Sequence, residues 1–394
     1  MTEKLKTTPT YAWIILAVVY FASIAAPLNQ YKPPPIMPIL MQQLHINLTE
    51  AGFLMSSIAL TGMILALPGG VILQKYGSKK SGLLALGCLL VGTILGAIAQ
   101  SFPLLAFSRI IEGIGAGLIG VVAPATLAQW FPADRLGVAM GIWATWAPVG
   151  SVVMYNSAPA LTARLGWRSV WWFGAIYTLV VALFYLGLIR RSPLYKEDAQ
   201  FSNPFLEMKK AFSNSGIWLL AIAFACFNLV LVSTATYYPT FLNTTLGYPL
   251  HLASFYSSIA TLVILFSAPF AGWLSDRMGS RKWLLALPFL AIAILLYFPF
   301  RVSGWGIILI MIIQGLLAGA IPTITFAASP EIMGKPEWAG LGLALILVGQ
   351  NLGQLIGPML FGDVAQNLGW ITAGYSLIPF CLLGFWCSWK LHIH

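Results

Sequence analysis

A loop sequence that occurs twice, each time between two long apolar segments, constrains the fold of this chain more than any other feature. The first copy, GVILQKYGSKK, occupies residues 70–80, and the second copy, GWLSDRMGSRK, occupies residues 272–282. Each copy connects two apolar segments in the same way. The chain therefore encodes two related membrane bundles, one after the other, as in many folds that contain internal repeats.

The repeat extends beyond the two loops. Residues 111–117, IEGIGAG, match residues 313–319, IQGLLAG, at the same separation as the loops, and Gly150 has a counterpart in Gly353 one residue further along. Matches at nearly one separation predict an all-α membrane protein with twelve transmembrane helices, arranged as two pseudo-symmetric six-helix bundles.

Composition supports a membrane protein and excludes a soluble one. Apolar residues make up 59% of the chain, charged residues make up 8%, and the mean hydropathy is +0.85, far from the values of soluble domains. A spanning helix needs about 20 mostly apolar residues. Twelve segments meet this requirement: 11–42, 50–74, 81–99, 103–129, 135–160, 167–189, 216–242, 250–274, 281–300, 304–329, 338–362 and 369–390.

These segments predict the domain organisation. An N-terminal six-helix bundle is expected over 1–189 and a C-terminal six-helix bundle over 216–394. The stretch between them, 190–215, is charged and long enough to be a cytoplasmic linker. Its apolar side chains alternate with basic ones, which predicts a short helix that lies on the cytoplasmic leaflet.

The basic residues predict how the chain lies in the membrane. With the N-terminus in the cytoplasm, most of the 21 lysines and arginines fall in the N-terminal tail, the even-numbered loops or the C-terminal tail. This asymmetry is the positive-inside rule and not a patch for nucleic acid. We therefore expect a monomer in the lipid bilayer of the cytoplasmic membrane, with both termini cytoplasmic and no nucleic-acid partner.

Catalytic and metal-binding patterns are absent from the sequence. It contains no H-E-x-x-H, P-loop or G-x-S-x-G sequence, and its four cysteines lie in predicted membrane segments without the spacing of metal ligands. We expect no enzyme, no catalytic residues, no cofactor and no metal. ATP-driven transport is therefore unsupported, which leaves gradient-driven or passive transport. A proton-coupled exporter of lipophilic compounds and a non-transporting membrane receptor are the alternatives.

Three ionisable residues lie inside predicted helices, where a charge costs between about 3 and more than 10 kcal/mol and usually marks a pathway. Arg109 and Glu112 share one face of a helix. They either neutralise each other, or Arg109 holds an anion and positions Glu112 as a proton carrier. Lys32, beside Asn29, either binds an anion or extends to the outer headgroups. Two cations and one carboxylate give a net charge of +1, which favours a small anionic substrate.

Further side chains of the predicted helices are expected in the substrate site. They are Trp146, Asn228, Gln314, Gln350, Asn351 and Gln354. Among them, Asn228, Gln314 and Gln350 lie near the predicted midplane, about 15–18 Å deep. Hydrogen bonding between helices is the competing explanation. Tyr237 and Tyr238, near the outer end of their helix, form either an outer gate or part of an aromatic belt.

Proline and glycine positions predict local features of the helices. Proline removes a backbone donor, so bends are expected at 33–35, Pro148 and Pro239. Small residues four apart allow helices to approach closely in lipid. This spacing occurs at Gly113 and Gly117, and again at Gly349, Gly353 and Gly357.

The doubled loop resembles the signature G-x-x-x-D-R-x-G-R-K that joins helices 2 and 3 in the major facilitator superfamily. Residues 109–115, RIIEGIG, are similar to the R-x-x-x-G-x-G motif of helix 4 in that family. The resemblance implies transport by alternating access between two bundles, and it links the helix 4 motif to substrate binding or proton coupling.

Residues 29–70 loosely resemble the branch of this family that includes cyanate and nitrate/nitrite transporters. Nitrate transporters carry an asparagine in both helices 5 and 11, whereas the helix 5 segment 141–150 contains none. Oxalate- and monocarboxylate-type relatives use basic residues in helices 8 or 11, which this chain lacks. The resemblance therefore implies a small monovalent anion, monocarboxylate- or cyanate-like, moved by symport or antiport.

The resemblance also implies that the two loops act as a cytoplasmic latch. In the family the aspartate of the motif engages the end of a neighbouring helix, where an acid is favourable. Asp276 can do this, whereas Gln74 can only hydrogen-bond, so the N-terminal latch should be weaker. The residues expected in gating are Gly70, Gln74, Gly77, Gly272, Asp276, Arg277 and Gly279.

Overall fold

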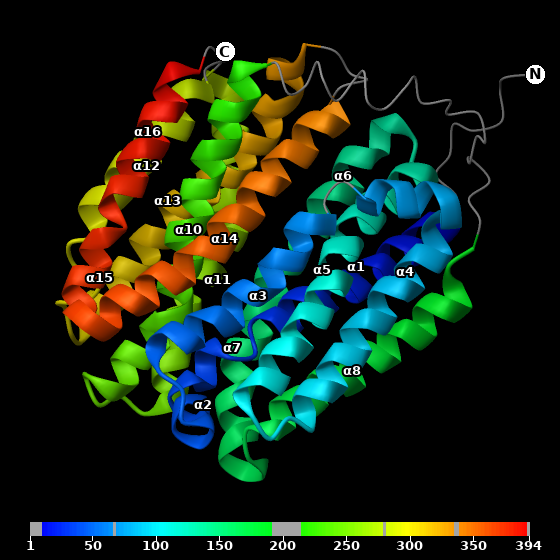
Figure 1. Ribbon diagram of the computed structural model, residues 1–394. Coiled ribbons are helices and arrows are strands. Elements are labelled where there is room, and N and C mark those ends of the chain that lie inside the picture. The colour runs from blue at the N-terminus through cyan, green and yellow to red at the C-terminus, as the bar shows by residue number, and fades with distance from the viewer. Residues whose placement is uncertain (1–9, 66–67, 191–213, 279–280, 335–338, 392–394) are drawn as a thin grey trace, which may run out of the picture.

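The computed structural model describes residues 10–65, 68–190, 214–278, 281–334 and 339–391, and these ranges are helical without any strand. Most of the predicted linker, with its interfacial helix, lies outside the described residues, and so does Gly279. The helices form two bundles that stand side by side, with the start of α1, at Thr10, and the end of α16, at Lys390, at the same end of the molecule (Figure 1).

The N-terminal bundle contains the helices that precede and follow the first loop motif in the sequence. Its elements are α1 (Thr10–Gln30), the 3₁₀ helix η1 (Pro34–Ile36), α2 (Met37–Leu44), α3 (Leu48–Leu65), α4 (Pro68–Ala97), α5 (Phe102–Trp130), α6 (Ala133–Ala144), α7 (Trp146–Leu165) and α8 (Arg168–Leu188).

The C-terminal bundle repeats this plan. Its elements are α10 (Ser215–Thr244), α11 (Leu250–Met278), α12 (Arg281–Leu295), α13 (Trp305–Met333), α14 (Ala339–Leu368), α15 (Trp370–Ser376) and α16 (Ile378–Lys390). The predicted all-α fold with two bundles is confirmed. The domain boundaries at 189 and 216 stay a prediction, because the chain between them is not described.

Within the described residues, eleven spans are long and apolar enough to cross a membrane. The predicted segment 281–300 is not among them, because α12 ends at Leu295 after 15 residues. The predicted segment therefore extends too far beyond the end of the helix. Pro299 has no backbone N–H, and its ring disfavours the helical conformation of the residue before it, so the chain turns instead of continuing the helix.

Two of the three predicted proline bends coincide with breaks. The first span, Thr10–Leu44, is divided between α1 and η1 beside prolines 33–35, and the fifth is divided at Thr145, three residues before Pro148. Helix α10 runs through Pro239 without interruption. The break after α1 matters most, because it exposes backbone carbonyls inside the N-terminal bundle.

Gly77 of the first loop motif occupies a conformation that other residues avoid. Its φ of 72° and ψ of 168° interrupt α4 between the end of the second predicted helix and the start of the third. Only glycine adopts this region at little cost. The glycine of the motif is therefore explained by the turn it makes.

The small-residue spacing predicted for helix packing is confirmed. A methyl group at Gly353 would collide with the backbone carbonyl of Ala225, and one at Gly357 would lie 2.5 Å from the carbonyl oxygen of Leu229. Helix α14 thus rests directly on the backbone of α10. Gly113 approaches α3 in the same way, because a methyl group there would collide with Thr61.

Replacement of Gly353 by Ala is expected to lower the free energy of unfolding by about 1–3 kcal/mol, the usual cost of overpacking. Gly120→Ala is the matched control, since a methyl group there would meet no atom within 4 Å outside its own stretch of helix, and alanine favours a helix over glycine by about 1 kcal/mol. Thermal unfolding of the purified protein in detergent, followed by circular dichroism, measures both. Equal midpoints for the two variants would contradict close packing of α10 on α14.

Hydrogen bonds join the two bundles in the halves of the helices that lie away from the loop motifs. The Tyr237 hydroxyl donates to the carbonyl oxygens of Leu48 in α3 and Pro358 in α14, at 2.7 and 3.0 Å. The Tyr155 hydroxyl donates to the carbonyl of Ala235 at 2.7 Å. The bundles are therefore tied together at the end opposite the start of α1 and the end of α16.

Candidate functional site

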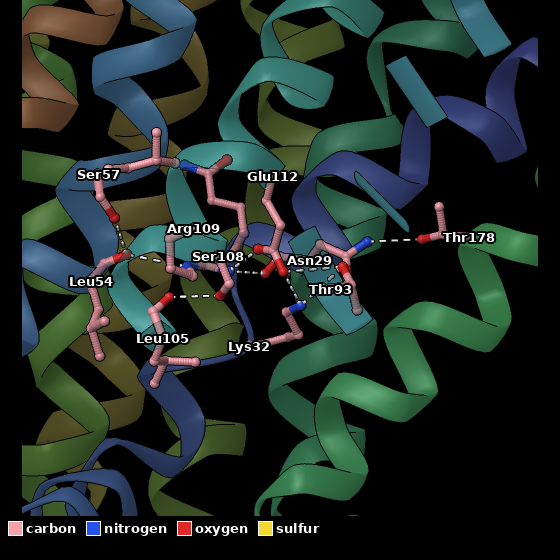
Figure 2. A network of polar contacts seen from close by, with 12 residues as sticks. Asn29, Lys32, Leu54, Ser57, Thr93, Leu105, Ser108, Arg109, Glu112 and Thr178 are labelled. Atoms are coloured by element: carbon pink, nitrogen blue, oxygen red, sulfur yellow. Dashed lines mark hydrogen bonds and ion pairs between the residues drawn. The ribbon is translucent and has the colours of Figure 1, made fainter. Parts of the chain in front are cut away.

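The three ionisable residues of the predicted membrane segments meet in one cluster inside the N-terminal bundle (Figure 2). Lys32 lies in the break after α1, and Arg109 and Glu112 lie one turn apart on α5. All three side chains are 0% exposed. We call Lys32, Arg109 and Glu112 the charge cluster.

Glu112 holds the charge cluster together because each of its carboxylate oxygens has a cationic partner. Lys32 Nζ lies 2.6 Å from Oε1, and an Arg109 Nη1 hydrogen points to Oε2. The Thr93 hydroxyl of α4 lies 3.0 Å from Glu112 Oε1 and 3.0 Å from Asn29 Oδ1. The cluster therefore links α1, α4 and α5 through one carboxylate.

Arg109 donates hydrogen bonds to the carbonyl oxygens at the end of α1, where the helix is broken. Its Nη1 donates to the carbonyl oxygen of Asn29 at 2.7 Å, and its Nη2 donates to that of Gln30 at 2.6 Å. In a continuous helix these carbonyls would accept from residues four positions later, but Pro33 and Pro34 have no N–H. The guanidinium replaces the missing donors, at the negative end of the helix dipole.

The other cation of the cluster is enclosed as well. Lys32 Nζ lies 5.0 Å from the centre of the Trp171 ring of α8, within the range of a cation–π interaction. The alternative reading, in which Lys32 extends to the outer headgroups, is wrong because the side chain has no exposed surface. Of the two readings for Arg109 and Glu112, the structure agrees with the first, in which the two side chains form an ion pair and neutralise each other.

Asn29 fastens α1 to α8 on the far side of the cluster. Its Nδ2 donates to the carbonyl of Ala25 at 2.7 Å and to the Thr178 hydroxyl at 3.0 Å. The side chain is 0% exposed, and a methyl group at Gly174 would collide with it. Asn29 is thus placed to fix the position of the α1 break.

Three amides continue from the cluster across the seam between the bundles. Gln30 Nε2 donates to Gln354 Oε1 of α14 at 3.2 Å, and Gln354 Nε2 donates to Asn228 Oδ1 of α10 at 3.2 Å. We call Gln30, Gln354 and Asn228 the amide row. Gln30 and Gln354 are partly exposed, whereas Asn228 is buried.

The remaining candidates are spread along the two bundles. Gln314 donates to the Thr234 hydroxyl at 3.2 Å within the C-terminal bundle. Asn351 donates to the carbonyl of Leu347 in its own helix, and a methyl group at Gly62 of α3 would lie 2.6 Å from Asn351 Oδ1. Gln350 is partly exposed on the same helix. The structure therefore does not gather these residues with the charge cluster.

The aromatic candidates are also spread over both bundles, with Trp146 in α7 and Tyr237 and Tyr238 in α10. Trp146 is partly exposed and stacks on Trp143, with ring centres 5.6 Å apart. Tyr237 bridges the bundles through its hydroxyl, and a methyl group at Gly52 would lie 2.5 Å from that oxygen. Tyr238 is 2% exposed and packs edge-on against Phe300. A belt residue would face lipid, so these two tyrosines are interior residues.

The described parts of the two loop motifs lie at the surface. Gln74, Asp276 and Arg277 are exposed, Gly70 and Gly272 are partly exposed, and no atom lies within 4 Å of a methyl group placed at Gly70. The Arg277 guanidinium lies 5.3 Å from the centre of the Trp273 ring. Among the described residues, no hydrogen bond or ion pair joins Asp276 to a helix end, so its engagement stays a prediction.

Sequence reasoning missed Thr93, which contacts Lys32, Glu112 and Asn29. A threonine in an apolar segment gives no signal of its own, since its hydroxyl usually bonds to its own helix. Gln30 was likewise not among the predicted site residues. The nearby prolines were the available sign that its carbonyl would need a partner from another helix.

Comparison with known families gives one match over most of the chain. The model of the Major Facilitator Superfamily matches residues 19–328 and residues 250–392.

Two relatives are similar over nearly the whole length of the chain. A chloramphenicol resistance protein of Streptomyces lividans is 27% identical, over 90% of this chain and 91% of its own. A protein of Cupriavidus necator named as a probable sulfoacetate transporter is 21% identical, over 98% of this chain and 92% of its own.

A solved structure has the same fold. It is a bacterial homolog of the human lysosomal transporter Spinster in an inward-facing and occupied conformation. It superposes with a TM-score of 0.84 at 15% identity and covers 97% of each chain.

Proposed function

Because this chain belongs to the major facilitator superfamily and is a multi-pass membrane transporter, we propose that it moves a small anion across the cytoplasmic membrane by secondary active transport. The observation that carries this proposal is the charge of the buried cluster. Lys32 and Arg109 face only one carboxylate, that of Glu112, so the cluster keeps a net charge of +1 with no exposed surface. In a medium of low dielectric constant, a net positive charge attracts an anion.

One of the two relatives supports an anionic substrate. The Cupriavidus necator protein is named for sulfoacetate, which is an organic anion. We propose a monocarboxylate- or cyanate-like anion for this chain, in symport or antiport with another ion. Glu112 is the residue proposed to carry a proton if the coupling ion is H⁺, since it is the only carboxylate in the cluster.

We propose that the described conformation opens toward the cytoplasm, on the topology given by the positive-inside rule. Tyr237 ties the bundles at the other end. Near the loop motifs only Ala139 is buried within residues 135–149, so this part of α6 and α7 packs against little protein. The exposed Gln74 and Asp276 fit the same proposal, because a closed latch would engage them.

Replacement of Lys32 by Ala tests the anion proposal. The charge of the cluster falls from +1 to zero, so uptake of small anions into proteoliposomes should fall at least about tenfold, the effect of roughly one lost charge interaction. Uptake is measured with radiolabelled monocarboxylates and cyanate, with and without a pH gradient. The control is Lys390→Ala, which removes an exposed lysine at the end of α16, outside both loop motifs. Unchanged uptake in Lys32→Ala would rule out the anion proposal.

A proton-coupled exporter of lipophilic compounds is the second candidate. It is favoured by the chloramphenicol resistance protein, which is 27% identical, and by the partly exposed Trp143–Trp146 stack, which offers a flat apolar surface. An exporter would transport neutral compounds in an acid-dependent manner and would keep that activity in Lys32→Ala. Counterflow with a neutral aromatic compound and with an anion separates the two candidates.

A further inference from the structure

We propose that the amide row of Gln30, Gln354 and Asn228 is the contact site of the transported anion, and that it selects planar oxyanions such as carboxylates. This inference rests on the proposed function above and names the atoms that touch the substrate. The amide row is the point where polar side chains of both bundles meet next to the charge cluster.

The charge cluster itself has no room for a ligand. Both oxygens of Glu112 are occupied by Lys32 and Arg109, and the guanidinium also donates to carbonyl oxygens of Asn29, Gln30 and, at 3.2 Å, Leu54. The three side chains are 0% exposed. An anion that bound directly to these cations would have to displace the groups that hold the α1 break.

The amide row differs from the cluster in access. Gln30 and Gln354 are partly exposed, and they belong to opposite bundles. A ligand can therefore reach both side chains from the seam without opening either bundle. A site shared by the two bundles is also what alternating access requires, because the substrate must lie at the interface that rocks.

The chemistry of the row suits an anion with two oxygens in one plane. Each amide nitrogen has two N–H donors, and in this conformation Gln30 and Gln354 each give one of them to a neutral amide oxygen. A carboxylate can accept from both nitrogens at once. Hydrogen bonds to a charged acceptor are roughly twice as strong as those between neutral groups, so the exchange favours the ligand.

The charge cluster acts on this site without touching the ligand. Arg109 Nη2 donates to the carbonyl oxygen of Gln30 at 2.6 Å, so the row begins at a residue held by the cation itself. In a medium of low dielectric constant a net charge acts over several ångströms. The cluster thus supplies the preference for negative charge, and the amides supply the preference for shape.

Replacement of Gln354 by Met in the full chain tests the inference, because methionine keeps the length of the side chain and removes both hydrogen-bonding groups. Exchange in proteoliposomes is measured for planar oxyanions (formate, pyruvate and nitrate) and for cyanate and chloride. The wild type should prefer the planar anions. Gln354→Met should raise their KM by about tenfold or more, as expected for a lost bond to a charged group, and should change cyanate and chloride less than about twofold.

Gln366→Met is the matched control. Gln366 Oε1 also joins the bundles, since it accepts from the backbone N–H of Leu48 at 3.2 Å, but it lies far from the charge cluster along α14. Gln30→Met is a second test that holds even if Gln354→Met does not fold. It should also weaken the preference for planar oxyanions. Thermal unfolding in detergent confirms that each variant is folded.

The outcomes separate this inference from the proposed function. If the wild type exchanges no anion, both fail. If it exchanges anions without preferring planar ones, or if Gln354→Met and Gln366→Met slow all anions alike, the amide row only tethers the bundles. The inference is then wrong, while anion transport stands. Loss of the planar preference in Gln354→Met and Gln30→Met alone supports it.

Discussion

Replacement of Arg109 by Met is expected to lower the free energy of unfolding by about 3–5 kcal/mol, the usual cost of removing one partner from a buried ion pair. The substitution leaves the carbonyl oxygens of Asn29 and Gln30 without the donors they receive at 2.7 and 2.6 Å. Thermal unfolding in detergent, followed by circular dichroism, measures the loss.

Arg281→Met is the matched control for this prediction. Arg281 also pairs with a glutamate, Glu331, at 3.0 Å, but the two side chains are 28% and 31% exposed. Exposed pairs contribute only about 0–1 kcal/mol. Arg109→Lys should fall between the two Met variants, because lysine keeps the charge and loses the planar fork that serves several acceptors. Similar losses in Arg109→Met and Arg281→Met would contradict the clamp on the α1 break.

Glu112→Gln is expected to have a comparably large effect for the opposite reason. It leaves two cations, Lys32 and Arg109, in a site with 0% exposure and no carboxylate. We expect a loss of about 3–5 kcal/mol in the free energy of unfolding, measured by the same thermal unfolding. Transport should be lost at all pH values, since the arrangement that holds the α1 break depends on this carboxylate.

A double variant distinguishes this electrostatic cause from simple loss of packing. In Lys32→Met with Glu112→Gln, the second cation is removed together with the carboxylate, so part of the stability should return. The effects of the two substitutions should therefore not add, as is typical of residues in one network. Additive losses would show that Lys32 and Glu112 contribute independently. Glu331→Gln, at the exposed pair, is the control for the change of glutamate itself.

Much of the fold could be predicted because its signals are local or repeated along the chain. The spacing of Gly349, Gly353 and Gly357 identified the face of α14 that rests on α10, since close approach in lipid requires small residues. The prolines at 33–35 identified the break after α1. The length of α12 was predicted wrongly, because hydropathy continues through Pro299 whereas the helix cannot.

The candidate site could be predicted only in part. Lys32, Arg109 and Glu112 stood out because charges are rare in apolar segments, yet two readings of each remained open. Spacing placed Arg109 and Glu112 on one face of α5 but could not bring Lys32 to them. That contact, Lys32 Nζ to Glu112 Oε1 at 2.6 Å, joins residues 80 positions apart. Thr93 gave no signal at all.

The sequence by itself therefore determined the class of fold, the two bundles and the residues whose burial needs a partner. Apolar length, glycine spacing and internal repeats follow from the chain order alone. Only the tertiary structure decided which partners meet. The break after α1 turns Lys32 inward and leaves the carbonyls of Asn29 and Gln30 to Arg109. Such contacts depend on how helices are rotated and crossed, and this geometry is set by packing across the whole bundle.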